Sequence, residues 1–173
     1  MTLLANKMDL GNASSELEAT SREKVAAGLR RLVADFFALY VKTKNYHWHM
    51  RGRHFRDYHL LLDDQGQQIF AAIDPLAERS RKLGFATVRS VGEINQLQRV
   101  ADDNVADLSP TAMLCNLAAD NRSLAQSMRE LHELCDEIND VATASLLENY
   151  LDEAEGRIWF LAETTYSEEV PAA

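Results

Sequence analysis

Histidines and carboxylates concentrate in one stretch of the chain. Four of the five histidines are His47, His49, His54 and His59. Acidic side chains follow them, at Asp63, Asp64, Asp74 and Glu78. Imidazole nitrogens mixed with carboxylate oxygens form the ligand set that suits iron or zinc. This stretch is therefore a candidate metal-binding region.

The geometry of a helix limits how these groups can share a metal. At about 100° per residue, one stripe of the helix holds His59, Asp63, Asp74 and Glu78. The helical rise separates His59 from Asp74 by roughly 22 Å, whereas ligand atoms lie about 2 Å from a metal ion. Two interpretations remain open: these residues are unrelated surface polar groups, or two copies of the helix pack antiparallel about a two-fold axis. In the second case the His47/His59 end of one subunit meets the Asp74/Glu78 end of its partner, and two-fold contacts are the commonest in soluble oligomers.

Apolar periodicity predicts four long helices. The first begins at a capping box, Thr20 to Glu23, and ends near His49. The second runs from about Arg53 to Leu83 and stops at Gly84. The connection over 85–109 includes a short helix begun by Ser90. Ser109-Pro110 opens the third long helix, and Asn139 or Asp140 caps the fourth.

This pattern predicts an all-α four-helix bundle. The turns between the first two and the last two long helices are short, whereas the middle connection is long enough to cross over and make the second and third long helices parallel. Many di-iron bundles build their site within one chain from Glu-x-x-His pairs. No histidine here has glutamate three residues before it. An iron site in this bundle would therefore not use the intrachain arrangement.

Composition narrows the function classes. No apolar run is long enough to span a bilayer, and the chain start lacks the apolar core of a secretory signal, so we expect a cytoplasmic protein. Cys115 and Cys135 are too far apart on one predicted helix for a disulfide, and we expect two buried free thiols. The net charge is −9, and the region 140–173 holds eight acids against one base, Arg157. This charge favours cations over nucleic acid as partners.

The residues of the candidate region resemble the signature of the Dps family, the DNA-protection-during-starvation proteins or mini-ferritins. The matching pattern is Asn45-Tyr46-His47-Trp48-His49-Met50-x-Gly52, then Phe55, His59 and Asp63, then Asp74-Pro75-Leu76-Ala77-Glu78-Arg79. The helix pattern, the crossover and Trp159-Phe160 extend the resemblance over nearly the whole chain from the first long helix onward.

The resemblance implies a ferritin-like bundle assembled into a hollow homododecamer with ferroxidase centres at its two-fold interfaces. It implies that His47 and His59 come from one subunit and Asp74 and Glu78 from the other, with Asp63 as an additional carboxylate. It also implies that iron(II) is oxidised, preferably with hydrogen peroxide, and stored as ferric mineral. No haem is expected.

Other polar and aromatic residues have weaker assignments. Trp48 either supplies an electron when one iron is present or packs at an interface. The acids Asp140, Glu148, Asp152 and Glu155 form either a solvated helix face or, as the resemblance suggests, a three-fold pore that guides iron inward. His49, where the family more often has asparagine, is expected at the surface or beside the ligands. We expect His54, His132 and Asp64 to be structural or solvated.

The sequence thus predicts an N-terminal tail over 1–19, a bundle over 20–167 and a short acidic tail over 168–173. The leading function is a peroxide-dependent ferroxidase and iron store that protects DNA and the cell from oxidative damage. One alternative is a nucleoid-associated, DNA-binding structural protein, and another is a metal-binding cage without redox turnover. Since residues 1–20 hold Lys7 as their only base and 168–173 are acidic, direct DNA binding is expected to be weak or absent.

Overall fold

The structure is a computed structural model that describes residues 17–166. It contains four long helices, α1 (Ala19–His49), α2 (Phe55–Lys82), α4 (Pro110–Glu137) and α5 (Val141–Thr165), and one short helix, α3 (Val91–Leu97). No strand occurs among the described residues. The predicted all-α bundle with a short helix in its crossover is confirmed.

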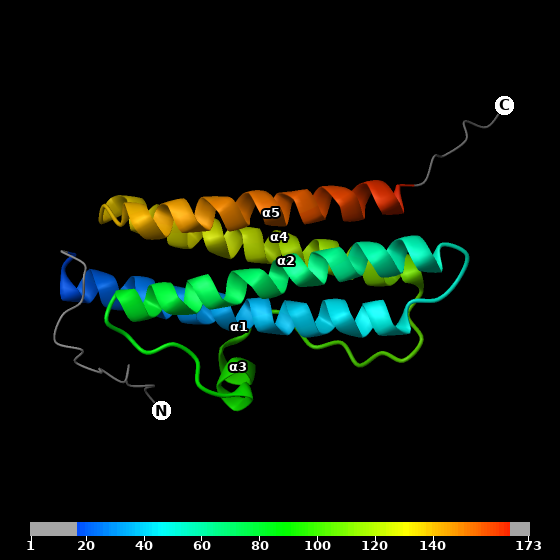
Figure 1. Ribbon diagram of the computed structural model, residues 1–173, viewed down its shortest axis with the longest axis horizontal. Coiled ribbons are helices and arrows are strands. Elements are labelled where there is room, and N and C mark those ends of the chain that lie inside the picture. The colour runs from blue at the N-terminus through cyan, green and yellow to red at the C-terminus, as the bar shows by residue number, and fades with distance from the viewer. Residues whose placement is uncertain (1–16, 167–173) are drawn as a thin grey trace.

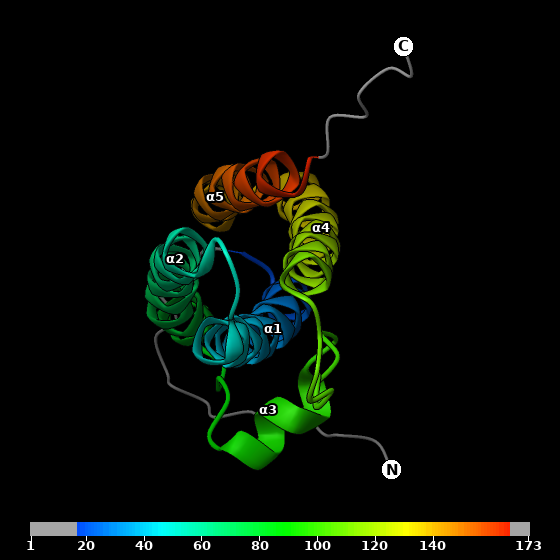
Figure 2. The ribbon, with the colours of Figure 1, turned by 90° about the vertical axis from the view of Figure 1, so that its right-hand side faces the viewer.

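The four long helices lie side by side, and the chain crosses the length of the bundle once between α2 and α4 (Figure 1). α1 and α2 form one antiparallel pair and α4 and α5 the other, so that α2 and α4 run in the same direction. Viewed along the bundle, α3 lies outside the four helices and against α1 (Figure 2). The predicted crossover therefore places α3 on the outer side of α1.

Three of the predicted helix starts are capped as expected. The side chains of Ser90, Ser109 and Asp140 accept hydrogen bonds from backbone N–H groups in the first turns of α3, α4 and α5. Such bonds satisfy amides that have no partner within the helix. Gly84, which follows α2, adopts a φ of 90°, a conformation that glycine accepts at little cost.

The predicted capping box at the start of the first helix is wrong. α1 begins at Ala19, and the residue before it, Glu18, makes no capping hydrogen bond with its side chain. Thr20 is therefore already inside the helix, because the backbone bond from Arg22 N–H to the Glu18 carbonyl starts the helix earlier.

The predicted tails lie outside the described residues, except for residues 17–19 of the N-terminal tail.

The core is built from the apolar faces of the four long helices. On α4, seven buried residues recur at helical spacing: Leu114, Leu117, Asn121, Leu124, Met128, Leu131 and Cys135. Cys115 is exposed, so the prediction of two buried thiols holds only for Cys135. Cys115 directly follows Leu114, and a step of about 100° takes its side chain off the inner face.

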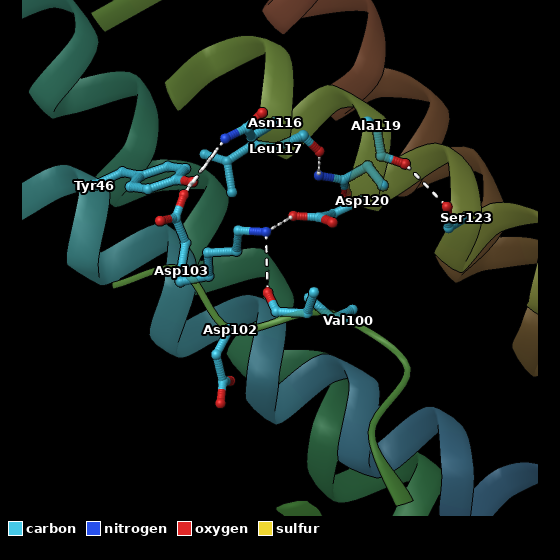
Figure 3. Close-up of polar contacts among 12 residues, drawn as sticks. Tyr46, Val100, Asp102, Asp103, Asn116, Leu117, Ala119, Asp120 and Ser123 are labelled. Atoms are coloured by element: carbon cyan, nitrogen blue, oxygen red, sulfur yellow. Dashed lines mark hydrogen bonds and ion pairs between the residues drawn. The ribbon is translucent and has the colours of Figure 1, made fainter. Parts of the chain in front are cut away.

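Polar contacts hold the crossover on α1. The buried carboxylate of Asp35 accepts hydrogen bonds from Arg99 Nη2 at 2.6 Å, Arg99 Nε at 2.9 Å and the Arg99 backbone N–H at 2.6 Å. Further along, the Tyr46 phenol points at the Asp103 carboxylate and the Asn116 amide (Figure 3). These bonds fix the path of the chain from α3 to α4 beside the end of α1 that carries His47.

Within the described residues, none of the helices combines the length and apolarity needed to cross a membrane.

Candidate metal centre

His47 and His59 face each other across the turn between α1 and α2. Their rings are stacked, with centroids 3.6 Å apart and an angle of 20° between planes. His47 Nδ1 lies 2.8 Å from the His59 carbonyl oxygen, and His59 Nδ1 lies 2.9 Å from the His47 carbonyl oxygen. Since a carbonyl only accepts, both Nδ1 atoms donate, so in a neutral ring the nitrogen with the lone pair is Nε2.

Such a bond from Nδ1 to a carbonyl is the usual way in which a protein orients a metal-binding imidazole. Among the described residues, neither Nε2 atom has a hydrogen-bond partner. The pair therefore holds two imidazole rings side by side, each with a nitrogen that is free to bind a metal.

The α1–α2 turn makes this pairing possible. Met50, which ends α1, is buried, and Gly52 has a φ of 113°. That left-handed conformation favours glycine. On the far side of the turn the Phe55 ring lies 5.0 Å from that of His59 and limits where the imidazole can move.

Asp63 lies one turn of α2 after His59 but is already paired. Lys44 Nζ, from α1, lies 2.7 Å from Asp63 Oδ1. The hydrogen bond from Lys44 is the main reason that the pKa of the Asp63 carboxyl is held below its usual value. Asp63 is thus an ionised carboxylate whose ligand role competes with an ammonium group.

Gly66 leaves room for Lys44 to cross α2. A Cβ atom placed on Gly66 would lie 3.3 Å from Lys44 Cδ, which is closer than ordinary carbon contacts. The aliphatic part of Lys44 therefore passes directly over Gly66 to reach Asp63.

Asp74 and Glu78 lie near the opposite end of α2 and are exposed. Glu78 forms an ion pair with Lys82, in which Lys82 Nζ lies 3.3 Å from Glu78 Oε2. Both side chains are exposed. The structure does not bring either acid to the histidine pair, and residues 17–166 contain no assembled group of three or more histidine, cysteine, aspartate or glutamate side chains that could hold a metal. One chain therefore supplies two separated halves of the predicted site.

The two halves are arranged symmetrically along α2. His59 and Glu78 are equidistant from a point between Gln68 and Ile69, and so are Asp63 and Asp74. Phe70, close to that point and on the same stripe, is 54% exposed. In an antiparallel pair of α2 helices centred there, His59 faces Glu78 and Asp63 faces Asp74 at both ends, with Phe70 near the axis.

Trp48 is 66% exposed. Among the described residues, its ring makes no aromatic contact with His47 or His59. It lines a groove of about 710 Å³ between α1 and the crossover, together with His49, Val91 and Val105. His49 is exposed, and its Nδ1 lies 2.8 Å from the Asn45 carbonyl oxygen. The structure thus places Trp48 and His49 on a largely apolar surface next to the histidine pair.

The acids predicted for a pore have different environments. Glu148 pairs with His132 at 3.1 Å and Glu155 pairs with Arg129, both partners coming from α4. Asp152 is exposed on the same side of α5. Three of the four predicted acids therefore share an exposed face, where Glu148 contacts His132 and Glu155 pairs with Arg129.

Asp140 does not share that exposed face. It is 3% exposed, caps α5 and accepts a hydrogen bond from Arg79 Nη2 at 2.6 Å. The predicted pore role of Asp140 requires an accessible carboxylate, whereas capping and the Arg79 ion pair hold this side chain inside the fold.

Comparison with known proteins matches this architecture. A ferritin-like domain model matches residues 26–166. DNA protection during starvation protein 1 of Deinococcus radiodurans is 32% identical over 145 residues, which are 84% of this chain and 70% of the relative. The chain belongs to the Dps family.

Solved Dps structures share the fold closely. Dps from Thermosynechococcus elongatus has a TM-score of 0.84 and 30% identity, covering 90% of this chain and 98% of that one. The Vibrio cholerae Dps protein, described as a member of a broad superfamily of ferritin-like diiron-carboxylate proteins, has a TM-score of 0.82 and 25% identity, covering 87% of this chain and 94% of that one. The Dps fold is therefore common to chains that differ at most positions.

Sequence reasoning does not predict two polar features of the bundle. The Lys44 ion pair crosses between helices, although Lys44 precedes His47 by one turn and could have been suspected from that spacing. Arg157 contributes a charge to the sequence pattern, whereas in the structure its side chain is buried in the bundle. Its place between Ala154 and Leu161, both on the inner face of α5, was the available signal.

Proposed function

We propose that this Dps protein oxidises iron(II), preferably with hydrogen peroxide, at sites shared by two subunits, and stores the ferric product inside a cage of twelve subunits. The observation that carries the proposal is the stacked histidine pair, in which each Nδ1 is bonded to the other residue's carbonyl and neither Nε2 has a partner among the described residues. The symmetric positions of Asp74 and Glu78 on the same helix support a partner subunit as the source of the remaining ligands.

The proposed ligands suit the reaction. Two imidazoles from one subunit and carboxylates from the other provide nitrogen and anionic oxygen donors, and anionic oxygen stabilises iron(III) relative to iron(II). Two iron(II) ions held together supply the two electrons that reduce one hydrogen peroxide to two hydroxide ions. No hydroxyl radical is released when both electrons arrive in one step. Trp48 is our proposed electron donor when only one iron is bound, and interface packing is the competing role for this exposed ring.

A subunit-mixing experiment tests whether the site is shared. One variant carries His47→Ala and His59→Ala, and the other carries Asp74→Ala and Glu78→Ala; each alone should lose ferroxidase activity. After dissociation and random reassembly, about a quarter of the sites should contain all the natural ligands. No recovery from a mixture that reassembles to the natural size would contradict a shared site.

Peroxide turnover separates the ferroxidase from a cage that only binds metal. Iron(II) is loaded without oxygen, hydrogen peroxide is added, and ferric absorbance is followed. We expect a rapid rise that the two histidine substitutions abolish. An absence of any rise would favour the redox-inactive cage, occupied by zinc or another ion.

Protection of DNA is proposed to follow from removal of iron(II) and peroxide rather than from contact. The acids of α5, among them Glu148, Asp152 and Glu155, give the exposed face a negative field that attracts cations and repels phosphate, and we propose these three as the lining of an iron entry pore. A gel shift at about 150 mM salt should show no tight complex with duplex DNA. Tight binding there would favour the nucleoid-structuring alternative.

A further inference from the structure

A charged side chain crosses the core of the bundle. Arg157, in α5, is 2% exposed. Its Nε donates a hydrogen bond to Asn121 Oδ1 of α4 at 2.8 Å, and its backbone carbonyl accepts one from Gln65 Nε2 of α2 at 3.3 Å. Three helices thus contribute to one buried polar cluster.

Most of the hydrogen-bonding capacity of Arg157 is not used within this cluster. Neither Nη1 nor Nη2 has an acceptor among the described residues, and both atoms are shielded from solvent. The nearest carboxylate, Glu153, is one turn earlier on α5 and lies 3.9 Å from Nη1, which is beyond hydrogen-bond distance. A guanidinium offers five N–H donors, and only one of them is engaged.

The buried guanidinium remains charged at neutral pH. Burial lowers the pKa of Arg157 to about 10, which still leaves it protonated. A buried charge without a hydrogen-bonded counter-charge costs several kcal/mol, on the order of the stability of a whole domain. The geometry of the cluster therefore calls for an acceptor that carries negative charge.

A further buried donor lies at the same level of the bundle. Thr43, from α1, is buried, and its hydroxyl has no partner among the described residues. The Thr43 methyl group lies 3.9 Å from a Cβ position on Gly66, the residue after Gln65. All four long helices thus present buried polar side chains at this level.

We propose that the bundle core binds one small monovalent inorganic anion, such as chloride, on the Nη1 and Nη2 groups of Arg157. The Thr43 hydroxyl offers a further donor at this level. One negative charge balances one guanidinium, and the enclosed position favours a small ion. The positive charge of the guanidinium repels cations from the bundle core, the part of the fold in which intrachain di-iron bundles hold their metals. In this protein, iron would be directed away from the core.

Crystals of the natural, full-length protein grown in bromide provide the direct test, because bromide replaces chloride and scatters anomalously. We expect one anomalous peak within hydrogen-bond distance of Arg157 Nη1 or Nη2 in every chain. A map without such a peak, with the Glu153 carboxylate or a protein group bonded to the guanidinium, would overturn the proposal.

Chemical denaturation supplies the energetic test. Chloride is varied against gluconate at constant ionic strength. Above the dissociation constant, each tenfold increase in chloride should shift the unfolding equilibrium constant of the natural chain about tenfold in favour of the folded state. Arg157→Met should remove this dependence, whereas Arg122→Met, at an exposed arginine of α4, should preserve it.

The remaining outcomes are also decisive. A bromide peak without any chloride dependence of stability would mean an adventitious ion only and would count against the proposal. If Arg157→Met does not fold, the chloride dependence of the natural chain together with the bromide map decides. Neither measurement uses iron, so failure here leaves the proposed ferroxidase function untouched.

Discussion

The Lys44–Asp63 ion pair decides how readily a third ligand joins the histidine pair. Lys44 reaches Asp63 from the neighbouring helix, and its hydrogen bond lowers the pKa of that carboxyl. An ion bound through Asp63 must therefore displace an ammonium group. We infer that the first iron bound at each proposed site uses His47, His59 and the partner's acids, and that Asp63 is engaged later.

Replacing Lys44 with methionine tests this competition while retaining the apolar stem over Gly66. We expect Lys44→Met to raise the Asp63 pKa back toward its usual value. It should also tighten divalent metal binding by up to about fivefold, because exposed ion pairs contribute little. Titration with zinc followed by calorimetry measures the affinity.

Lys42→Met is the matched control. Lys42 is two residues away on α1 and pairs with Asp120 of α4 at 2.7 Å instead. The Lys42→Met substitution should leave the zinc affinity unchanged. Equal effects of both substitutions would mean that net charge, rather than the Asp63 pair, controls affinity.

Close packing between α1 and α4 depends on a glycine. A Cβ on Gly28 would lie 2.6 Å from Leu131 Cδ1, whereas one on Gly156, within α5, would meet no atom within 4 Å. The same substitution should therefore have opposite effects at these two helical positions.

We expect Gly28→Ala to lower the free energy of unfolding by about 1 to 3 kcal/mol through overpacking. Gly156→Ala should raise it by about 0.5 to 1 kcal/mol, because alanine favours the helical state. Urea denaturation followed by circular dichroism gives both values. A loss of stability in Gly156→Ala would indicate an unrecognised contact on that face of α5.

The helices could be predicted because local chemistry specifies them. Ser90 and Ser109 begin α3 and α4 through bonds to nearby amides, and the inner face of α4 follows from apolar spacing alone. The capping box predicts the start of α1 two residues late, because the Arg22 N–H bonds to the Glu18 carbonyl and the helix begins before Thr20.

The histidine pair was predictable in part, whereas its surroundings were not. Residue type and spacing identify His47 and His59, but their bonds to each other's carbonyls depend on the path of the turn. The Lys44 and Arg157 contacts each join different helices. Such contacts depend on how helices are rotated against one another, which the period of one helix does not specify.

At the scale of the whole molecule, the exposed stripe of α2 has the composition of a contact surface. It combines Phe70 with the proposed ligands at both ends, and a phenylalanine that is half exposed favours burial against a partner. An antiparallel α2 pair would cover Phe70 and assemble two metal sites in the same step.

We expect Phe70→Glu to prevent this pairing, because two glutamates would meet near the two-fold axis. The natural chain should elute as particles of about twelve subunits, and the variant as smaller species that retain helical circular dichroism and lose ferroxidase activity. Light scattering coupled to gel filtration measures the size.

Gln68→Glu places the same charge on α2 but about 160° from Phe70 around the helix, at another exposed position. The Gln68→Glu variant should assemble into particles of the same size as the natural chain. If Phe70→Glu also forms particles of full size, α2 is not at the two-fold contact.

The orienting bonds of the two imidazoles end on main-chain oxygens, not on side chains. Alanine at position 47 would delete one ring yet keep the peptide group that steers the other, and the reverse holds at position 59. Each single replacement should therefore subtract one nitrogen donor while its neighbour stays aimed, so kinetic losses in such variants report on coordination rather than on a collapsed loop.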